Sequence, residues 1–189
     1  MSGDKRNGAG GEDLYSRVVE GDRDALAGLI ELYGASLSLF INGFVNDIRD
    51  VEEITIDTFV ELIKNRSRFQ GESSFKTYLF SIGRNLALRY RKNNGKRLPA
   101  DGIGEAADDK TPEAEYLLEE GKQRLYRIIR GMKTDHREVL HLIYFEGMSY
   151  AESARILKKS ERQIEGLLYR AKKTLKSRLE SEGLTHEDF

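Results

Sequence analysis

The chain has 189 residues with a net charge of -1, 33% of them are charged, and none is cysteine. A chain of this length forms one domain or two small ones, and the lack of cysteine excludes disulfides and thiolate metal sites and fits a cytoplasmic protein. The polar N-terminus lacks the apolar segment of a secretory signal, and no apolar run approaches the roughly 18–20 residues of a membrane span, so we expect no membrane insertion.

Helical spacing of apolar residues dominates the first half of the chain. Residues Met1–Gly11 are glycine-rich and polar, and we expect them to be disordered. The pattern then predicts three helices, over Arg23–Phe44, Asp50–Asn65 and Phe75–Asn93. Turn-forming residues between the second and third helices predict a loop over Arg66–Ser74, with Ser74 capping the third helix.

A change of composition follows the third helix. Gly95–Lys110 contains a proline and three glycines without periodicity, which is typical of a linker. Thr111-Pro112-Glu113 carries helix-start chemistry and predicts a helix to about Met132, and Asp135 with Glu138 is expected to cap the next helix. We therefore predict an all-α chain of two small helical domains, residues 12–94 and 112–182, joined by a flexible linker over residues 95–111.

Two capping boxes lie near the C-terminus, Ser149-x-x-Glu152 and Ser160-x-x-Gln163. The first opens a short helix to Leu157, and a three-residue break leads to a long basic helix. This is the outline of a helix-turn-helix, and a plain helical hairpin with a basic outer face is the alternative. Lys158 occupies the turn position where glycine is common, so a positive φ there would cost on the order of 1 kcal/mol.

The start of the second helix of such a motif reaches base edges, and later basic residues meet phosphates. The residues expected on the DNA side are Lys159, Ser160, Arg162, Gln163, Glu165, Tyr169, Arg170 and Lys173.

The small net charge hides three blocks of opposed sign. Residues 47–61 hold six acids and one base, residues 84–97 hold six bases and no acid, and residues 162–178 hold six bases and one acid. This segregation suggests two surfaces that face polyanions and one acidic surface for a basic partner. Solvated helix faces are the alternative for each block taken alone.

Two stretches of the chain resemble bacterial sigma factors. The segments DVEEITIDTF (Asp50–Phe59) and RFQGESSFKTYLFSIGRNLALRYRK (Arg68–Lys92) resemble their second conserved region. The segment MKTDHREVLHLIYFEGMSYAESARILKKSERQIEGLLYRAKKTLKSRL (Met132–Leu179) resembles their fourth region. In this order, with a short linker between them, they resemble an extracytoplasmic-function (ECF) sigma factor, the smallest class.

The resemblance implies roles for both halves. The acidic helix would dock on the clamp helices of the RNA polymerase β′ subunit, the C-terminal domain would meet the β flap, and an anti-sigma factor is a possible further partner. The polymerase-contacting candidates are Asp50, Glu52, Glu53, Asp57 and Phe59. The loop and helix after it would hold the melted minus-ten element with stacking aromatics and a cationic track, and the candidates are Arg68, Phe69, Lys76, Tyr78, Arg84, Asn85, Arg89 and Lys92.

Within that set, Asn85 matches the family's helix asparagine, whose amide could hydrogen-bond an extruded base. Most of the aromatics could instead belong to the core, which we favour for Phe75 and Tyr90. The sequence also departs from the family. Ile56 stands where glutamine is frequent, and Tyr78 where tryptophan is usual.

Two further departures lie in the helix-turn-helix. Ser153 replaces an apolar residue, and Glu165 replaces a basic one. A glutamate at that place can accept a hydrogen bond from cytosine N4, so the minus-thirty-five preference is expected to be unusual.

The leading hypothesis is a dissociable polymerase subunit that directs core RNA polymerase to promoter DNA and assists promoter opening. The three histidines have no ligand-like spacing and no phosphate-binding loop is present, so we expect no catalytic activity, no metal site and no cofactor. The alternatives are a conventional helix-turn-helix regulator that binds duplex operators and an adaptor that binds the polymerase alone.

Overall fold

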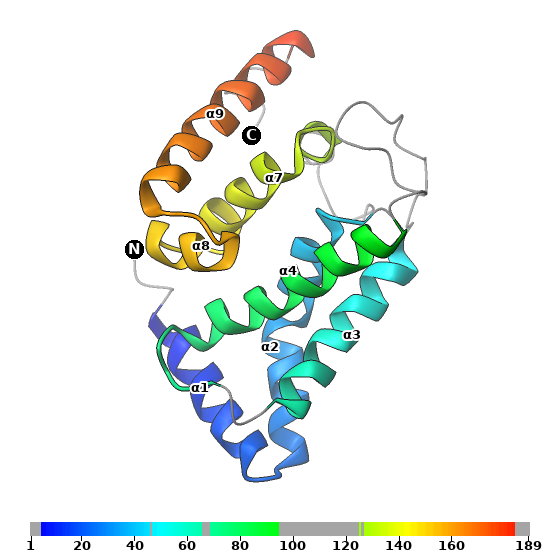
Figure 1. The fold of residues 1–189 in the computed structure, drawn as a ribbon, viewed down its shortest axis with the longest axis vertical. Helices are drawn as coiled ribbons and strands as arrows, with labels where there is room; N and C mark the ends of the chain where they lie inside the picture. Colours follow the sequence, from blue (N-terminus) through cyan, green and yellow to red (C-terminus); the bar gives the residue numbers. More distant parts are fainter. Residues whose placement is uncertain (1–4, 46, 66–68, 95–124, 126, 184–189) are drawn as a thin grey trace.

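The computed structural model describes residues 5–45, 47–65, 69–94, 125 and 127–183 (Figure 1). Every regular element within these ranges is a helix, which confirms the all-α fold class. The predicted linker over residues 95–111 and the helix start at Thr111 lie outside the described residues, so the domain boundaries stay a prediction.

Four helices form the N-terminal half: α1 (Lys5–Val19), α2 (Arg23–Asn42), α3 (Ile48–Lys64) and α4 (Phe75–Asn94). The caps explain where the last three begin. The carboxylates of Asp22 and Asp47 accept hydrogen bonds from the first backbone N–H groups of α2 and α3. The Ser74 hydroxyl accepts from the Thr77 N–H at 3.3 Å, so the predicted cap of α4 is confirmed.

The first helix contradicts the expectation of disorder at the N-terminus. Its C-terminal part buries Tyr15 and Val18 in the core, which offsets the poor helix propensity of its glycines. Gly11 lies directly under the ring of Tyr33, and any side chain there would collide with that ring. The glycine therefore serves close packing of α1 on α2, a reason that local sequence does not reveal.

By length and composition, α2 is the one described helix that could cross a membrane. One face of α2 is fully buried at Leu29, Leu37 and Ile41, whereas Ile30, Leu32 and Leu39 are exposed. The buried face packs against α1, α3 and α4, so the core of the N-terminal half accounts for this part of its hydropathy.

The C-terminal half contains helical residues 127–130, then α7 (Thr134–Leu140), the π-helical turn η1 (His141–Phe145), α8 (Tyr150–Leu157) and α9 (Glu161–Ser181). Both predicted capping boxes are present, at Ser149 and at Ser160. Lys158 has φ 54° and ψ 47°, so this turn does require the left-handed conformation.

One predicted cap is wrong. The helix α7 begins after Lys133 without a side-chain cap, and Asp135 does not form a capping box with Glu138. Glu138 is instead buried and pairs with Arg84 of the other half. A contact between residues this far apart in the chain overrides the local capping signal.

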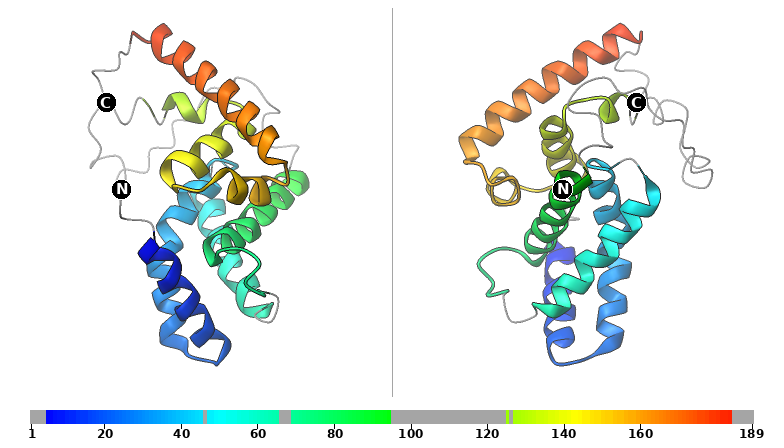
Figure 2. Two further views of the ribbon diagram at one scale, coloured as in Figure 1. Left: turned by 90° about the vertical axis from the view of Figure 1, so that its left-hand side faces the viewer. Right: turned by 45° about the vertical axis from the view of Figure 1, so that its right-hand side comes forward.

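The two halves pack against each other through α4. This helix contacts α1, α2 and α3 on one side and α8 on the other. Both views in Figure 2 show α8 beside α4, with the other N-terminal helices packed on the opposite side of α4. The flank of α4 that faces the C-terminal half is thus covered in this structure.

Candidate functional site

The first candidate surface is a groove along the start of α9. It has a volume of about 390 Å³ and lies between α9 and the N-terminal end of α7. Its lining residues are Asp135, Lys159, Ser160, Arg162, Gln163, Gly166, Leu167 and Arg170. Five of the eight side chains expected on the DNA side therefore lie together, and the other three, Glu165, Tyr169 and Lys173, are exposed on the same helix.

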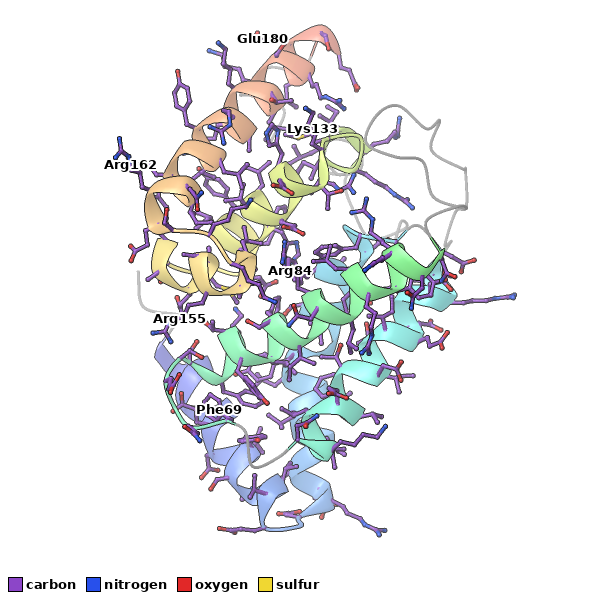
Figure 3. The ribbon with its side chains drawn as sticks, viewed as in Figure 1. Phe69, Arg84, Lys133, Arg155, Arg162 and Glu180 are labelled. Atoms are coloured by element: carbon purple, nitrogen blue, oxygen red, sulfur yellow. The ribbon has the colours of Figure 1, made fainter. Side chains whose placement is uncertain are left out.

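Packing of α9 explains why these side chains face outward. Ile164, Leu168 and Ala171 are buried against α7 and α8, and Leu167 is buried at the base of the groove. Figure 3 shows Arg162 pointing away from both halves of the molecule. The groove is thus open to a large ligand.

The capping box at the start of α9 fixes the chemistry of two groove residues. Gln163 Oε1 accepts a hydrogen bond from the Ser160 N–H at 2.8 Å, so the Gln163 side chain has its amide hydrogens left to donate. Lys159 Nζ lies 3.2 Å from Asp135 Oδ2, and this pair is partly exposed. Donors and cations on a helix N-terminus suit the edges and phosphates of a nucleic acid.

The second candidate surface is a pocket of about 240 Å³ between the C-terminal end of α3 and the middle of α4. Its lining residues are Glu61, Asn65, Tyr78, Ile82, Asn85, Leu86 and Arg89. Asn85 and Arg89 are exposed, whereas Tyr78 is half-buried. The expected flank of α4 with Tyr78, Asn85 and Arg89 thus forms one wall.

A cluster of aromatic rings adjoins this pocket at Tyr78. The rings of Phe69 and Tyr78 lie 5.2 Å apart, and Phe69 meets Phe75 and Tyr15 edge-on at 5.9 and 5.4 Å. Phe75 is fully buried, as favoured from the sequence. The half-buried Phe69 is thus anchored in the core cluster while part of it stays accessible. Arg68, beside it, lies outside the described residues.

Two other minus-ten candidates face the C-terminal half instead of solvent. Lys76 Nζ lies 3.0 Å from Glu146 Oε2 and donates to the Glu146 carbonyl at 2.9 Å. Arg84 Nη2 lies 3.1 Å from Glu138 Oε2, and Figure 3 shows Arg84 between α4 and the C-terminal half. These two cations are therefore covered in the packed arrangement, while Lys92 at the end of α4 is exposed.

The carboxylates in this contact have shifted pKa values. Burial raises the pKa of Glu138, and the neighbouring Arg84 only partly opposes this. Burial would also raise the pKa of Glu146, but hydrogen bonds from His141 and Lys76 outweigh it and lower the pKa. The interface therefore holds charged groups that depend on one another for stabilisation.

A third carboxylate, that of Glu152, lies in the same interface. Glu152 accepts hydrogen bonds from the hydroxyls of Ser74 at 2.9 Å and Thr77 at 3.3 Å, at the start of α4. Nearby, Arg155 of α8 donates to the Glu72 carbonyl. Glu138, Glu146 and Glu152 together bind one flank of α4, and we call them the interface carboxylates.

The acidic surface on α3 agrees with the sequence except at one position. Glu52, Glu53 and Asp57 are exposed. Asp50 is half-buried and accepts a hydrogen bond from Tyr90, which together with burial raises the pKa of Tyr90 to about 12. Phe59 is 4% exposed and belongs to the core, so the structure corrects its assignment as a polymerase-contacting side chain.

Sequence reasoning missed several lining residues. Glu61 and Asn65 lie four residues apart on α3 and face the pocket beside α4, and Asp135 forms the far side of the α9 groove. The four-residue spacing of Glu61 and Asn65 predicts that they share a helix face, but it does not predict which helix that face contacts. Ile56, beside the acidic residues, is 64% exposed.

Comparisons with known proteins match this two-part layout. Residues 29–97 match the model for sigma-70 region 2, and residues 122–175 match the model for sigma-70 region 4. The chain belongs to the sigma-70 family. The acidic helix and the α3–α4 pocket fall in region 2, and the α9 groove falls in region 4.

Curated relatives assign this sigma factor to the ECF class. It is 27% identical to the ECF RNA polymerase sigma-E factor of Haemophilus influenzae, over 88% of this chain and 94% of the relative. It is 26% identical to the RNA polymerase sigma-H factor of Pseudomonas aeruginosa, over 89% and 93%. These relatives do not favour the alternative of a conventional regulator.

Solved structures share the arrangement of helices. The structure of CnrH in complex with the cytosolic domain of CnrY has a TM-score of 0.68 and 25% identity, over 91% of this chain and 98% of that chain. The sigma factor RpoE from Bartonella quintana, in complex with the anti-sigma factor NepR, has a TM-score of 0.60 and 22% identity, over 80% and 94%. The second likeness supports the fold.

Proposed function

We propose that this ECF sigma factor reads promoters with two separate surfaces, one on each half. The α9 groove would bind the minus-thirty-five element as duplex DNA, and the α3–α4 pocket would receive an unpaired base of the minus-ten element. The observation that carries this proposal is the gathering of donors and cations in one groove and of an amide, a guanidinium and an aromatic wall in one pocket.

The acidic surface of α3 supports the assignment of a protein partner. Glu52, Glu53 and Asp57 present carboxylates to solvent around the exposed Ile56. Such a mixture of charges around an apolar side chain suits the basic clamp helices of the polymerase β′ subunit. The β flap would be the partner of the C-terminal half, and the site of action would be the cytoplasm, with catalysis left to the polymerase.

The packed arrangement bears on how the sites are used. Lys76 and Arg84 would track the minus-ten strand, yet both pair with the interface carboxylates. We therefore propose that the halves part when these two cations meet DNA. An anti-sigma factor that binds across both halves would stabilise the packed arrangement.

Transcription from a promoter library with core polymerase tests the proposal. We expect initiation to depend on the chain, Asn85→Ala to impair opening more than duplex binding, and Arg170→Ala to weaken minus-thirty-five engagement. Arg23→Ala changes an exposed residue at the start of α2 and serves as control.

Each other outcome has a definite meaning. Normal initiation by both variants would contradict the residue assignments. Operator binding without any new transcription starts would indicate a conventional regulator, and polymerase binding without promoter choice would indicate an adaptor.

A further inference from the structure

The α3 wall of the α3–α4 pocket contains a carboxylate held in a fixed pair. Asn65 Nδ2 donates to Glu61 Oε1 at 2.7 Å and to the Glu61 carbonyl at 3.1 Å. Both residues are half-buried, and both line the pocket. A carboxylate on a surface that meets DNA repels phosphates, so its presence there calls for a different ligand group.

The Glu61–Asn65 pair fixes which atoms face the pocket. Both atoms of Glu61 that Asn65 contacts are acceptors, so the amide nitrogen of Asn65 must lie toward them. The Asn65 carbonyl oxygen then remains as an acceptor, as do the other lone pairs of the Glu61 carboxylate. Both Asn65 amide hydrogens are directed at Glu61, so this pair offers only acceptors to the pocket.

The α4 wall has the opposite character. Arg89 offers only donors, and Asn85 offers a donor pair and an acceptor. Within the described part of the chain, neither side chain makes a hydrogen bond or ion pair with another residue. A ligand between the walls meets acceptors on one side and donors on the other.

We propose that Glu61 determines base specificity in this pocket by accepting a hydrogen bond from an exocyclic amino group. This inference rests on the proposed function and deepens it. Cytosine and adenine carry such a group, at N4 and N6, whereas thymine and guanine carry the acceptors O4 and O6 at the corresponding position. Thymine would place the lone pairs of O4 against the carboxylate, at the position where cytosine or adenine places its amino group.

The exclusion of thymine follows from the cost of an unpaired polar group. A site built around a hydrogen bond to an amino group discriminates against a base with an acceptor at that position, because the carboxylate is then desolvated against a second acceptor. Asn65 acts as the positioning residue, since its amide holds Glu61 Oε1 in place. Arg89 and Asn85 would pair with the ring nitrogen and carbonyl acceptors of the same base.

The test is open-complex formation by holoenzyme on a library randomised across the minus-ten element, for the wild type and Glu61→Gln. At one position, we expect the wild type to disfavour thymine by about tenfold relative to the better of cytosine and adenine. Glu61→Gln places an amide donor in the pocket, so the preference at that position should fall to about threefold or less. Glu31→Gln, an exposed glutamate on α2, is the matched control and should keep the wild-type profile.

A purely structural role for Glu61 predicts a different result. Loss of structure would lower the signal for all four bases equally and leave their ratios unchanged. The inference is overturned if no position disfavours thymine, or if Glu61→Gln keeps the base ratios while thermal melting shows it folded. Wild-type holoenzyme that initiates nowhere would instead overturn the proposed function itself, which separates the two failures.

Discussion

Replacing Glu138 with alanine is expected to destabilise the contact between the two halves. The Arg84 and Glu138 side chains are only 10% and 2% exposed. Water therefore solvates neither charge well when the other is removed. Arg84 Nε is already buried without a hydrogen-bond partner among the described residues. The charge of Arg84 therefore depends on Glu138.

The size of the effect follows from this dependence. Removing one partner of a buried ion pair costs about 3–5 kcal/mol, because the other charge stays buried and unpaired. The raised pKa of Glu138 indicates that burial destabilises the ionised carboxylate by more than the charge of Arg84 stabilises it. Replacing both partners with apolar residues, as in Arg84→Met with Glu138→Leu, is thus expected to restore most of the lost free energy.

Urea denaturation and an interdomain distance measurement check this expectation. The chain has no native cysteine, so single cysteines at the exposed positions Glu20 and Glu180 can carry a fluorophore pair. Energy transfer should decrease in Glu138→Ala and recover in the double variant. A cost below about 1 kcal/mol for Glu138→Ala, the range of an exposed pair, would refute the reasoning.

Three further outcomes are expected. Ser153→Ala should raise the free energy of unfolding by about 1 kcal/mol, because the Ser153 hydroxyl is fully buried without a hydrogen-bond partner in the described part of the chain; a loss in urea denaturation would count against this. Lys158→Gly should raise it by about 0.5–1 kcal/mol by relieving the positive φ, whereas Lys158→Ala, which keeps the strain, should not. Burial would raise the pKa of Glu146, but its hydrogen bonds hold it below the ordinary 4.5, so its stabilisation is present above that pH and is lost as the pH falls through the lowered pKa. Glu146→Gln should therefore show a flatter acid limb in stability measured against pH, and an unchanged limb would contradict this.

Local signals in the sequence specified most of the helices. The caps at Ser74, Ser149 and Ser160 and the apolar spacing of α2, α3, α4 and α9 are properties of a few neighbouring residues, and the structure has them as expected. The helix α1 escaped detection because its stability comes from burial of Tyr15 and Val18 and from the fit of Gly11 under Tyr33.

The parts of the site that could not be predicted are set by contacts distant in the chain. Glu138 carries a local capping signal, but its partner lies 54 residues away, and Lys76 meets Glu146 across 70 residues. The Glu61–Asn65 pair is readable from its spacing on one helix. Its role depends on the neighbouring α4, whose position relative to α3 no local pattern gives.

The C-terminal half and a ligand of the minus-ten side would use the same flank of α4. The stability of the packed arrangement therefore determines the affinity for that ligand. A ligand of that flank binds only the fraction of molecules whose halves are apart, so its apparent dissociation constant exceeds the intrinsic value by the inverse of that fraction. With roughly one molecule in a hundred open, the ligand would bind about a hundredfold more weakly than to a permanently open form. Each interface carboxylate thereby affects the ligand concentration that is needed to occupy this flank. Substitutions at these three positions would raise or lower that concentration.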